Sequence, residues 1–307
     1  MADTTHTRYG LVLATYGSHA RVALDTDEEL DCGIRGKRLR PVAGDRVRVS
    51  CPGDRQAMIE AIEPRRTELA RQKGHAGRQV LAANIDRMAV VIATEPPPEP
   101  GIVDRYLAAA EDMGIDALLV HNKEDLAHGA PPEWLSEFTD IGYAVLHTSA
   151  TRDQGITELA GYLAGHIAIL VGQSGTGKST LLNRLVGTDV ARTGELSEGT
   201  GEGRHTTTTA FLHPLPGGGG LVDSPGVRDF HPCPVRPERV THLFREIREA
   251  AAGCRFSDCA HRREPGCAVR DAVDAGQISA RRYRSYCRMH EQMLETAARN
   301  PAMFGSD

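Results

Sequence analysis

Gly172-Gln173-Ser174-Gly175-Thr176-Gly177-Lys178-Ser179 has the form G-x-x-x-x-G-K-S. The apolar run before it, residues 167–171, is typical of a buried strand, and residues 180–186 predict a helix that ends at Gly187. A glycine-rich turn between a strand and a helix directs several backbone N–H groups at one anion, and the helix N-terminus adds partial positive charge. The stretch therefore predicts a site for a nucleoside triphosphate.

The residues of this loop have different expected roles. Its glycines let the backbone fold back around a phosphate group. Lys178 is expected to reach the β- and γ-phosphates, and the Ser179 hydroxyl is expected to ligate Mg²⁺. The predicted nucleotide-binding residues of this segment are Gly172, Gln173, Ser174, Gly175, Thr176, Gly177, Lys178, Ser179 and Thr180.

Length and composition indicate how many domains the chain has and which kinds of protein it can be. The chain has 307 residues, which suggests two or three domains, and its 40% hydrophobic and 25% charged residues are ordinary for a globular protein. No apolar run approaches the roughly 18–20 residues of a membrane span, and residues 1–10 lack the apolar core of a signal peptide. We therefore expect a cytoplasmic protein without membrane contact. Because the net charge is −5, contact with nucleic acid must come from local basic patches.

Residues 1–75 are expected to form a small β-barrel of the oligonucleotide-binding (OB) type. Short alternating apolar segments at 9–13, 20–24 and 46–49 predict strands, and Gly44-Asp45 is expected to be a hairpin-type turn. A basic cluster in one connection suits a phosphate backbone, but it is equally compatible with a solvated loop. The cluster consists of Arg35, Lys37, Arg38 and Arg40.

Residues 76–232 alternate between predicted strands and helices. Apolar runs at 88–93, 117–120 and 143–147 predict buried strands, and residues 103–113 predict an amphipathic helix. This alternation predicts a mostly parallel sheet with both faces covered. In such sheets ligands bind beyond the carboxyl ends of the strands, where the phosphate loop also lies.

Polar residues follow two of these predicted strands. Asn122-Lys123-Glu124-Asp125 has the form N-K-x-D, and Ser149-Ala150 follows the next strand. The Asp125 carboxylate can accept hydrogen bonds from N1–H and N2–H₂ of guanine, whereas adenine offers no amino group at that position. Asn122 and Lys123 are expected to brace the loop and cover the ring, and Ser149-Ala150 to direct a backbone N–H at the base oxygen. The two segments predict specificity for guanine; the alternative is a solvated charged loop.

Two further segments are expected to sense the γ-phosphate. The first, residues 203–209, contains Thr207 and Thr208, our first choices for a magnesium ligand, although these β-branched residues also suit the start of a strand. The second, Asp223-Ser224-Pro225-Gly226, has the form D-x-x-G. Asp223 is expected to hold Mg²⁺ through water, and the Gly226 N–H to contact the γ-phosphate.

The order N-K-x-D, Ser-Ala, phosphate loop, threonine switch and D-x-x-G is a circular permutation of the usual GTPase order. With its flanking modules, the chain resembles the small ribosomal subunit biogenesis GTPase family RsgA (YjeQ/YloQ) from about residue 9 to about residue 293. The resemblance implies binding to the small ribosomal subunit, GTP hydrolysis stimulated by the ribosome, and a role in late maturation of that subunit.

The resemblance also suggests a catalytic residue. Val227 follows D-x-x-G where many GTPases carry a glutamine, and it cannot orient the attacking water. His205 lies in a G-R-H-T-T-T segment similar to that of the family, in which this histidine is implicated in catalysis. We predict a catalytic His205; the alternative is that it contacts the ribosome or packs.

Residues 233–307 are expected to form a helical module with a metal site. Cys254-x4-Cys259-x-His261-x5-Cys267 supplies three thiolates and one imidazole, a ligand set for structural Zn²⁺ that is similar to the zinc motif of the family. Free cysteines or a disulfide are the alternative. Further on, the arginines suit ribosomal RNA beside Tyr283 and Tyr286, or else a solvated amphipathic helix. They are Arg281, Arg282, Arg284 and Arg288.

The sequence thus predicts an α/β protein: a circularly permuted P-loop GTPase domain with an N-terminal OB-type β-barrel and a C-terminal helical zinc-binding module. Its expected partners are GTP, GDP, and the small ribosomal subunit with its rRNA, and we expect a monomer. One rival is a metabolic NTP-dependent enzyme such as a kinase, for which the sequence offers no second substrate site. Another is a nucleotide-regulated RNA-binding module with negligible turnover.

Overall fold

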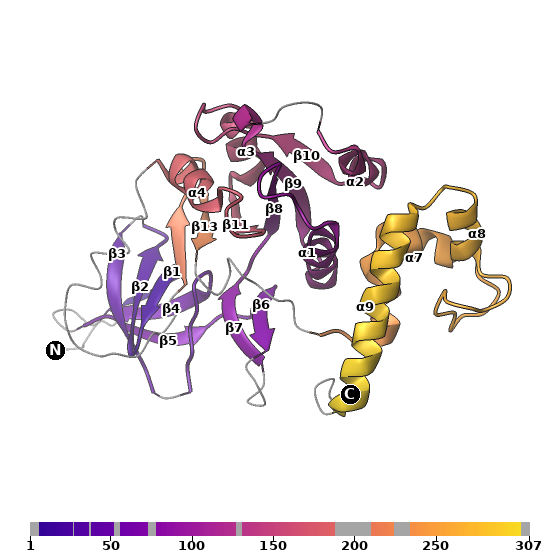
Figure 1. The fold of residues 1–307 in the computed structure, drawn as a ribbon. Coiled ribbons are helices and arrows are strands. Elements are labelled where there is room, and N and C mark those ends of the chain that lie inside the picture. Colours follow the sequence, from indigo (N-terminus) through magenta and orange to yellow (C-terminus); the bar gives the residue numbers. More distant parts are fainter. Residues whose placement is uncertain are drawn as a thin grey trace.

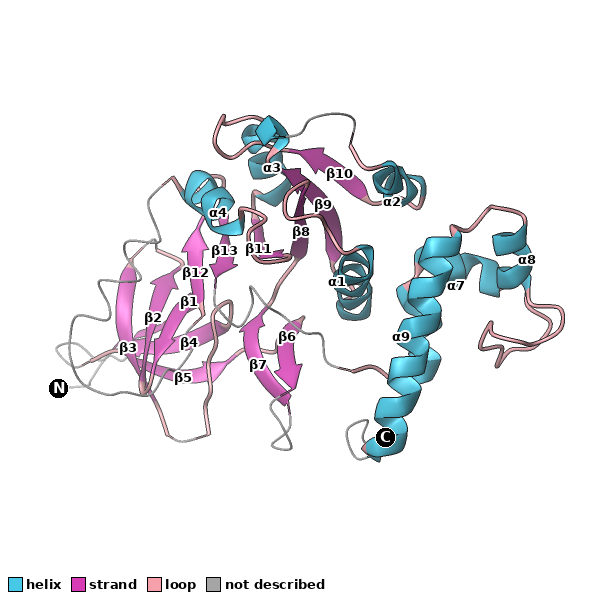
Figure 2. Cartoon of the chain, viewed as in Figure 1, coloured by secondary structure: helices cyan, strands magenta, loops and turns pink. Residues whose placement is uncertain are grey.

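The computed structural model describes residues 6–26, 28–36, 38–51, 56–72, 78–126, 131–187, 210–223 and 234–301. Three parts follow one another across the molecule: a strand-rich barrel, a central sheet flanked by helices, and a helical module at the C-terminal end (Figure 1). Figure 2 shows the same order as a change from strands to helices. The predicted three-part architecture is therefore confirmed.

The N-terminal strands close into a barrel. Neighbouring strands pair in the order β1-β2-β3-β5-β4, and β4 pairs again with β1. The barrel interior is apolar, with Val12, Val22, Val47 and Ile59 fully buried, because alternate residues of each strand point inward. The strands are β1 (His6–Tyr16), β2 (His19–Leu24), β3 (Glu29–Ile34), β4 (Arg46–Cys51) and β5 (Met58–Ile62).

The hairpin predicted at Gly44-Asp45 is wrong. Strands β3 and β4 lie before and after this pair but do not pair with each other; each is bonded to β5 instead. The Gly44 backbone, at φ 89°, approaches residue 83 so closely that a Cβ atom would lie 2.1 Å from the Ala83 carbonyl oxygen. Glycine is required here because the barrel wall touches the next element of the chain.

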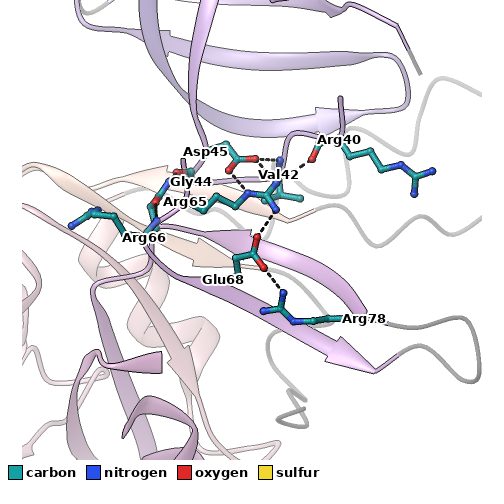
Figure 3. A network of polar contacts seen from close by, with 9 residues as sticks. Arg40, Val42, Gly44, Asp45, Arg65, Arg66, Glu68 and Arg78 are labelled. Carbon is teal, nitrogen blue, oxygen red and sulfur yellow. Dashed lines mark hydrogen bonds and ion pairs between the residues drawn. The ribbon is translucent and has the colours of Figure 1, made fainter. Parts of the chain in front are cut away.

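That next element is a hairpin of β6 (Glu68–Gln72) and β7 (Arg78–Ala83). A polar network holds it against the barrel (Figure 3). The Asp45 carboxylate, fully buried, accepts hydrogen bonds from Arg65 Nε at 2.7 Å, Arg65 Nη2 at 2.9 Å and the Val42 N–H at 2.8 Å. Arg65 also donates to Glu68 at 3.0 Å and to the Arg40 carbonyl at 3.2 Å. Both carboxylate oxygens of Asp45 thus accept hydrogen bonds from within the protein.

The central sheet is parallel except for its strand β12. From β8 the chain moves outward to β9 and β10 and then returns to β11 on the other side of β8, so the strand order reverses between β8 and β11. The strands, in spatial order, are β10 (Ala144–His147), β9 (Asp116–Asn122), β8 (Arg87–Ala93), β11 (His166–Val171), β13 (Gly219–Asp223) and β12 (Phe211–Pro214).

Helices cover both faces of this sheet, as predicted. One apolar cluster joins the sheet to α1 (Pro100–Met113) and α2 (Ser136–Asp140), and the other joins it to α3 (Ile156–Leu163) and α4 (Lys178–Val186). The strands carry continuous apolar runs because both of their faces are buried. Two short 3₁₀ helices, η2 (Glu124–Leu126) and η3 (Glu133–Leu135), lie between β9 and α2.

The barrel and the central sheet are hydrogen-bonded to each other. β1 pairs antiparallel with β12 through Ala14 and Phe211, and the Tyr16 ring packs edge-on against Phe211 at 5.8 Å between ring centres. All strands except β6 and β7 therefore form one 11-stranded sheet.

The C-terminal module consists of η4 (Pro237–Leu243), α7 (Arg245–Ala251), α8 (Ala268–Asp274) and α9 (Ala280–Arg299). It has its own apolar core, which includes Phe244, Ile247 and Tyr286 and also reaches Ala108 of α1. Among the helices in the described ranges, none has the length and apolarity that crossing a membrane requires.

The predicted rRNA-binding role of the α9 arginines is wrong for part of the set. Arg282 is 2% exposed and pairs with Asp104 of α1 at 2.7 Å and with Glu246 at 2.7 Å. Arg281 pairs with Asp104 at 3.0 Å, and Tyr286 is fully buried. Arg281 and Arg282 fasten the module to α1 through Asp104, and the buried Arg282 and Tyr286 cannot reach RNA. Arg284 and Arg288 are exposed.

We expect Asp45→Ala to lower the free energy of unfolding by about 3 kcal/mol, because the largely buried Arg65 loses its fully buried counter-charge and keeps only the more exposed Glu68. Asp31→Ala is the matched control: this carboxylate is 70% exposed, lies 3.6 Å from Arg21, and should cost less than about 1 kcal/mol. Urea unfolding curves of both variants and the parent chain measure the difference. Equal losses for the two variants would contradict a stabilising role of the Asp45–Arg65 pair.

Candidate functional site

The reversal of strand order between β8 and β11 marks the expected ligand site. In open parallel sheets the crevice at such a reversal lies beyond the carboxyl ends of the strands. The loops that follow β8, β9, β10 and β11 all emerge at this edge. They carry the polar segments that the sequence singles out, with Asn122 ending β9 and His147 ending β10.

The phosphate loop connects β11 to α4, as predicted. Gly177 precedes the helix at φ 93°, and a Cβ atom there would lie 2.4 Å from Asn122 Nδ2, so only glycine fits. The Lys178 ammonium donates hydrogen bonds to the carbonyl oxygens of Gly172 at 2.7 Å and Gln173 at 2.6 Å. Lys178 thus lies across its own loop, while the next residue, Ser179, is exposed.

Asn122 links the N-K-x-D segment to the phosphate loop. Its amide Nδ2 donates to the Thr176 carbonyl oxygen at 2.9 Å. Its Oδ1 accepts from the Thr148 hydroxyl at 3.0 Å and from the Ala150 N–H at 3.3 Å. Asn122 is 1% exposed, so this amide is shielded from competing water. One side chain therefore joins the loops that follow β9, β10 and β11.

Asp125 is held in the ionised form by hydroxyl groups. Ser149 Oγ donates to Asp125 Oδ1 at 2.5 Å, and Thr151 Oγ1 donates to Oδ2 at 3.0 Å. The Ser149 hydrogen bond is the main reason why the pKa of Asp125 is lowered from its ordinary value, and Thr151 contributes less. A carboxylate has about four lone-pair positions, so Asp125 can accept further hydrogen bonds, as recognition of two adjacent N–H groups requires.

The remaining residues of the N-K-x-D segment point elsewhere. Lys123, at φ 64°, extends toward the loop after β8 and donates to the Glu95 carbonyl oxygen at 2.9 Å. Glu124 turns to His121 and His147, which lie 2.5 Å and 2.7 Å from its Oε1. Burial raises the pKa of Glu124, but the hydrogen bonds from His147 and His121 outweigh this and lower it. Its side chain thus belongs to a histidine cluster.

The predicted switch residues are only partly described. Asp223 ends β13, which runs parallel to β11, so it lies at the same sheet edge as the phosphate loop. His205, Thr207, Thr208 and Gly226 lie outside the described residues.

The C-terminal cluster of Cys254, Cys259, His261 and Cys267 comes together as predicted. The four ligand atoms lie within 4.8 Å of one another. Cys254 Sγ and Cys267 Sγ each lie 3.5 Å from His261 Nδ1. In a tetrahedral site with metal–sulfur bonds of about 2.3 Å and metal–nitrogen bonds of about 2.0–2.1 Å, the two ligand atoms are roughly 3.5 Å apart. The cluster can therefore hold a metal ion in this geometry.

The electrostatics of the cluster agree with this use. Burial lowers the pKa of His261, which keeps its imidazole neutral and able to ligate. Burial and the neighbouring thiols raise the pKa of Cys259 to about 12, a cost that a divalent cation offsets because it stabilises thiolates. The ring of Tyr286 lies beside His261, and its hydroxyl donates to the Ala260 carbonyl oxygen at 2.9 Å.

Glu264 shapes the loop that carries these ligands. Its carboxylate accepts the backbone N–H groups of Ala260 at 3.1 Å, Arg262 at 2.8 Å and Arg263 at 2.9 Å. Although burial raises it, these backbone hydrogen bonds lower the pKa of Glu264 to about 2. Nothing in the sequence singles out Glu264, since a loop carboxylate between metal ligands resembles any exposed glutamate.

Other supporting residues were also missed. Thr148 and Thr151 flank Ser149-Ala150 and supply the hydroxyl groups that orient Asn122 and Asp125. Arg184 of α4 donates to the Ala150 carbonyl oxygen at 3.0 Å. The threonines were within reach of sequence reasoning, because hydroxyl residues on both sides of the Ser-Ala pair indicate donors beside the predicted carboxylate.

Comparison with known proteins connects this geometry to a family. The sequence model of the RsgA GTPase family matches residues 62–232. The chain is 42% identical over 301 residues to "Small ribosomal subunit biogenesis GTPase RsgA 1" of Vibrio vulnificus, covering 95% of this chain and 85% of the relative. This chain belongs to the RsgA GTPase family. Its membership makes it a GTP-hydrolysing enzyme.

Other members of the RsgA family agree over the same length. RsgA of Haemophilus influenzae is 40% identical over 296 residues, covering 94% of this chain and 85% of the relative. The crystal structure of YjeQ from Thermotoga maritima superimposes with a TM-score of 0.75 at 30% identity, covering 94% of this chain and 99% of that one. The crystal structure of YloQ, described as a circularly permuted GTPase, superimposes with a TM-score of 0.75 at 23% identity. The match covers 95% of this chain and 96% of YloQ, and it shows the same fold. The predicted permuted GTPase fold is confirmed.

We expect Ser149→Ala to raise the pKa of Asp125 toward its ordinary value, because the strongest donor to its carboxylate is removed. A lowered carboxyl pKa stabilises the folded loop above the pKa of the unfolded chain, and this stabilisation is lost as pH falls through the folded pKa. The variant should therefore protonate Asp125 at higher pH, as followed by carboxyl ¹³C NMR. Ser136→Ala, whose hydroxyl donates to a backbone carbonyl, is the control. If the pKa of Asp125 is the same in Ser149→Ala and in the parent, the Ser149 hydrogen bond is not the cause of its lowered value.

Proposed function

We propose that this chain binds GTP at the sheet edge described above, hydrolyses it under stimulation by the small ribosomal subunit, and assists late maturation of that subunit. The observation that carries the proposal is the Asn122–Thr176 hydrogen bond, which joins the N-K-x-D segment to the phosphate loop. It allows Asp125 and Lys178 to hold the base and the phosphates of one nucleotide. The curated relatives are named as small ribosomal subunit biogenesis GTPases, which supports the biological role.

In this proposal the nucleotide contacts are divided among the loops. Asp125 accepts N1–H and N2–H₂ of guanine, and the Ala150 region faces the base oxygen. The backbone N–H groups of residues 172–180 surround the phosphates, with Lys178 leaving its two carbonyl partners for the β- and γ-phosphates. Ser179, exposed at the start of α4, and Thr207 ligate Mg²⁺, while Asp223 holds it through water and Gly226 contacts the γ-phosphate.

The remaining roles concern catalysis, zinc and partners. His205 orients the attacking water, since Val227 cannot. The Cys3His cluster holds one structural Zn²⁺, supported by the 3.5 Å sulfur–nitrogen separations. rRNA contacts fall to exposed arginines that are not buried in ion pairs, Arg38 and Arg40 on the barrel and Arg284 and Arg288 on α9. The chain acts as a cytoplasmic monomer.

Base recognition is tested by Asp125→Asn. An asparagine amide cannot accept from both N1–H and N2–H₂ of guanine, so the Kd for GTP should rise by about 10²-fold or more, and xanthosine triphosphate, with a carbonyl at C2, should bind better. Fluorescent-nucleotide titration measures both constants. Asp153→Asn, an exposed carboxylate paired with Arg184, is the matched control and should keep GTP selectivity. The same GTP affinity in Asp125→Asn and the parent would overturn the base assignment.

Turnover with and without purified small subunits tests the function as a whole. We expect small subunits to raise the GTPase rate of the parent chain, with ATP remaining a poor substrate. His205→Ala should lower the stimulated rate by about 10²-fold or more while GTP affinity stays nearly intact, because general acid–base groups act on the chemical step. If small subunits do not raise the GTPase rate of the parent chain, the proposed ribosomal role is wrong. An undiminished rate in the variant would remove His205 from the mechanism.

A further inference from the structure

A second cluster of metal-ligating side chains lies where β9 and β10 end, beside the N-K-x-D segment. It consists of His121, Glu124 and His147, whose ligand atoms lie within 4.8 Å of one another. His121 and His147 occupy matched positions on the adjacent parallel strands β9 and β10. Residues in register on neighbouring strands project to the same face, and Glu124, in the first turn of η2, closes the triangle.

The cluster has the support that metal-ligating histidines usually have. His121 is 1% exposed, and while its Nδ1 faces Glu124, its Nε2 lies 3.3 Å from the Thr94 hydroxyl. A hydrogen bond at the second ring nitrogen fixes the tautomer and the ring orientation of a histidine ligand. The rings of His121 and His147 stand nearly perpendicular, with their centres 5.5 Å apart, so both Nδ1 atoms converge on Glu124 Oε1.

We propose that His121, Glu124 and His147 form a binding site for a divalent transition-metal ion, with Zn²⁺ as the reference ion. Two imidazoles and one carboxylate suit Zn²⁺ and its first-row neighbours, whereas Mg²⁺ prefers an all-oxygen shell. This site is separate from both the Cys3His cluster and the magnesium that accompanies GTP.

Binding requires only small movements. The present contacts of 2.5 Å and 2.7 Å are hydrogen bonds, and an ion with ligand bonds of about 2.0 Å would replace them and separate the nitrogen and oxygen atoms to roughly 3.3 Å. The His147 side chain is 42% exposed and free to make this adjustment, while the more buried His121 stays fixed.

One ligand of the cluster also borders a hollow in the protein surface. His147 lines a hollow of about 400 Å³ between β10 and the segment that leads into α2. His147 can therefore be reached from this hollow, in agreement with its 42% exposed side chain. Its other lining residues are Pro131, Pro132, Glu133, Leu135, Ser136, Thr139 and Val145.

A bound ion would tie the end of β9 to the end of β10. Glu124 lies between Lys123 and Asp125, so fixing its carboxylate restrains the backbone that carries both of them. The ion would then stabilise the same two strand ends that Asn122 and Thr148 already connect.

Metal content of the full-length chain tests the proposal. Protein stripped with a chelator is equilibrated with micromolar free Zn²⁺, and bound zinc is measured by elemental analysis. We expect His147→Ala to hold one ion fewer per chain than the parent. His166→Ala is the matched control, because its side chain is 37% exposed on the same sheet, and it should hold as much zinc as the parent. Equal zinc in His147→Ala and the parent would overturn the proposal and leave the cluster a hydrogen-bond network.

Cobalt substitution then separates the two clusters. Loss of the His121–Glu124–His147 site should lower the ligand-field absorption of cobalt and leave the thiolate-to-cobalt charge-transfer band unchanged. Cys259→Ser should instead lower the intensity of the charge-transfer band, because one of three thiolates is lost. Thr94→Val, which keeps all three ligands, should raise the Kd for Zn²⁺ by about tenfold. Glu124→Gln keeps a hydrogen-bond acceptor and serves as a second ligand variant, which should also hold one ion fewer. Charge-transfer loss in His147→Ala would contradict the assignment.

Discussion

The side-chain amide of Asn122 holds the nucleotide site together. Its two ends contact Thr176 of the phosphate loop and, after β10, Thr148 and Ala150, so segments supplied in permuted order converge on one buried group. Parallel strands make this possible, because their carboxyl ends meet at one edge whatever the order in which the chain visits them. The close contact with Gly177 shows how tightly the amide is enclosed, since no other residue type fits beside it.

Much of the site could be predicted because its chemistry requires particular residue types at particular spacings. The phosphate loop needs glycine at positions of positive φ, and Gly175 and Gly177 have φ values of 82° and 93°. A tetrahedral metal site needs four soft or borderline ligands in short loops, which the Cys3His segment provides. Glu264 could not be predicted in this way, because its carboxylate acts through backbone hydrogen bonds that only the folded loop brings together.

The sequence predicts those parts of the fold whose strands and helices follow from their apolar pattern. It predicts less well the parts whose packing depends on buried ion pairs. The strands and helices of the central sheet follow from continuous apolar runs. The arginines of α9 looked like an RNA-binding stretch, yet Arg282 is buried against Asp104, a residue 178 positions earlier in the chain. The Gly44-Asp45 pair likewise resembled a hairpin turn, but Asp45 is a buried partner of Arg65. Such long-range ion pairs leave no local pattern in a sequence.

The pairing of β1 with β12 makes the barrel a cover for the catalytic domain. β12 is the last strand of the central sheet on that side, and β1 pairs with it through Ala14 and Phe211. A fragment that lacks the N-terminal barrel would present β12 as an unpaired edge strand. Its Phe211 ring would no longer be covered by Tyr16. Unprotected strand edges recruit other chains and promote aggregation. The GTPase domain of this protein therefore relies on a module that precedes it in the chain to cover one edge of its sheet.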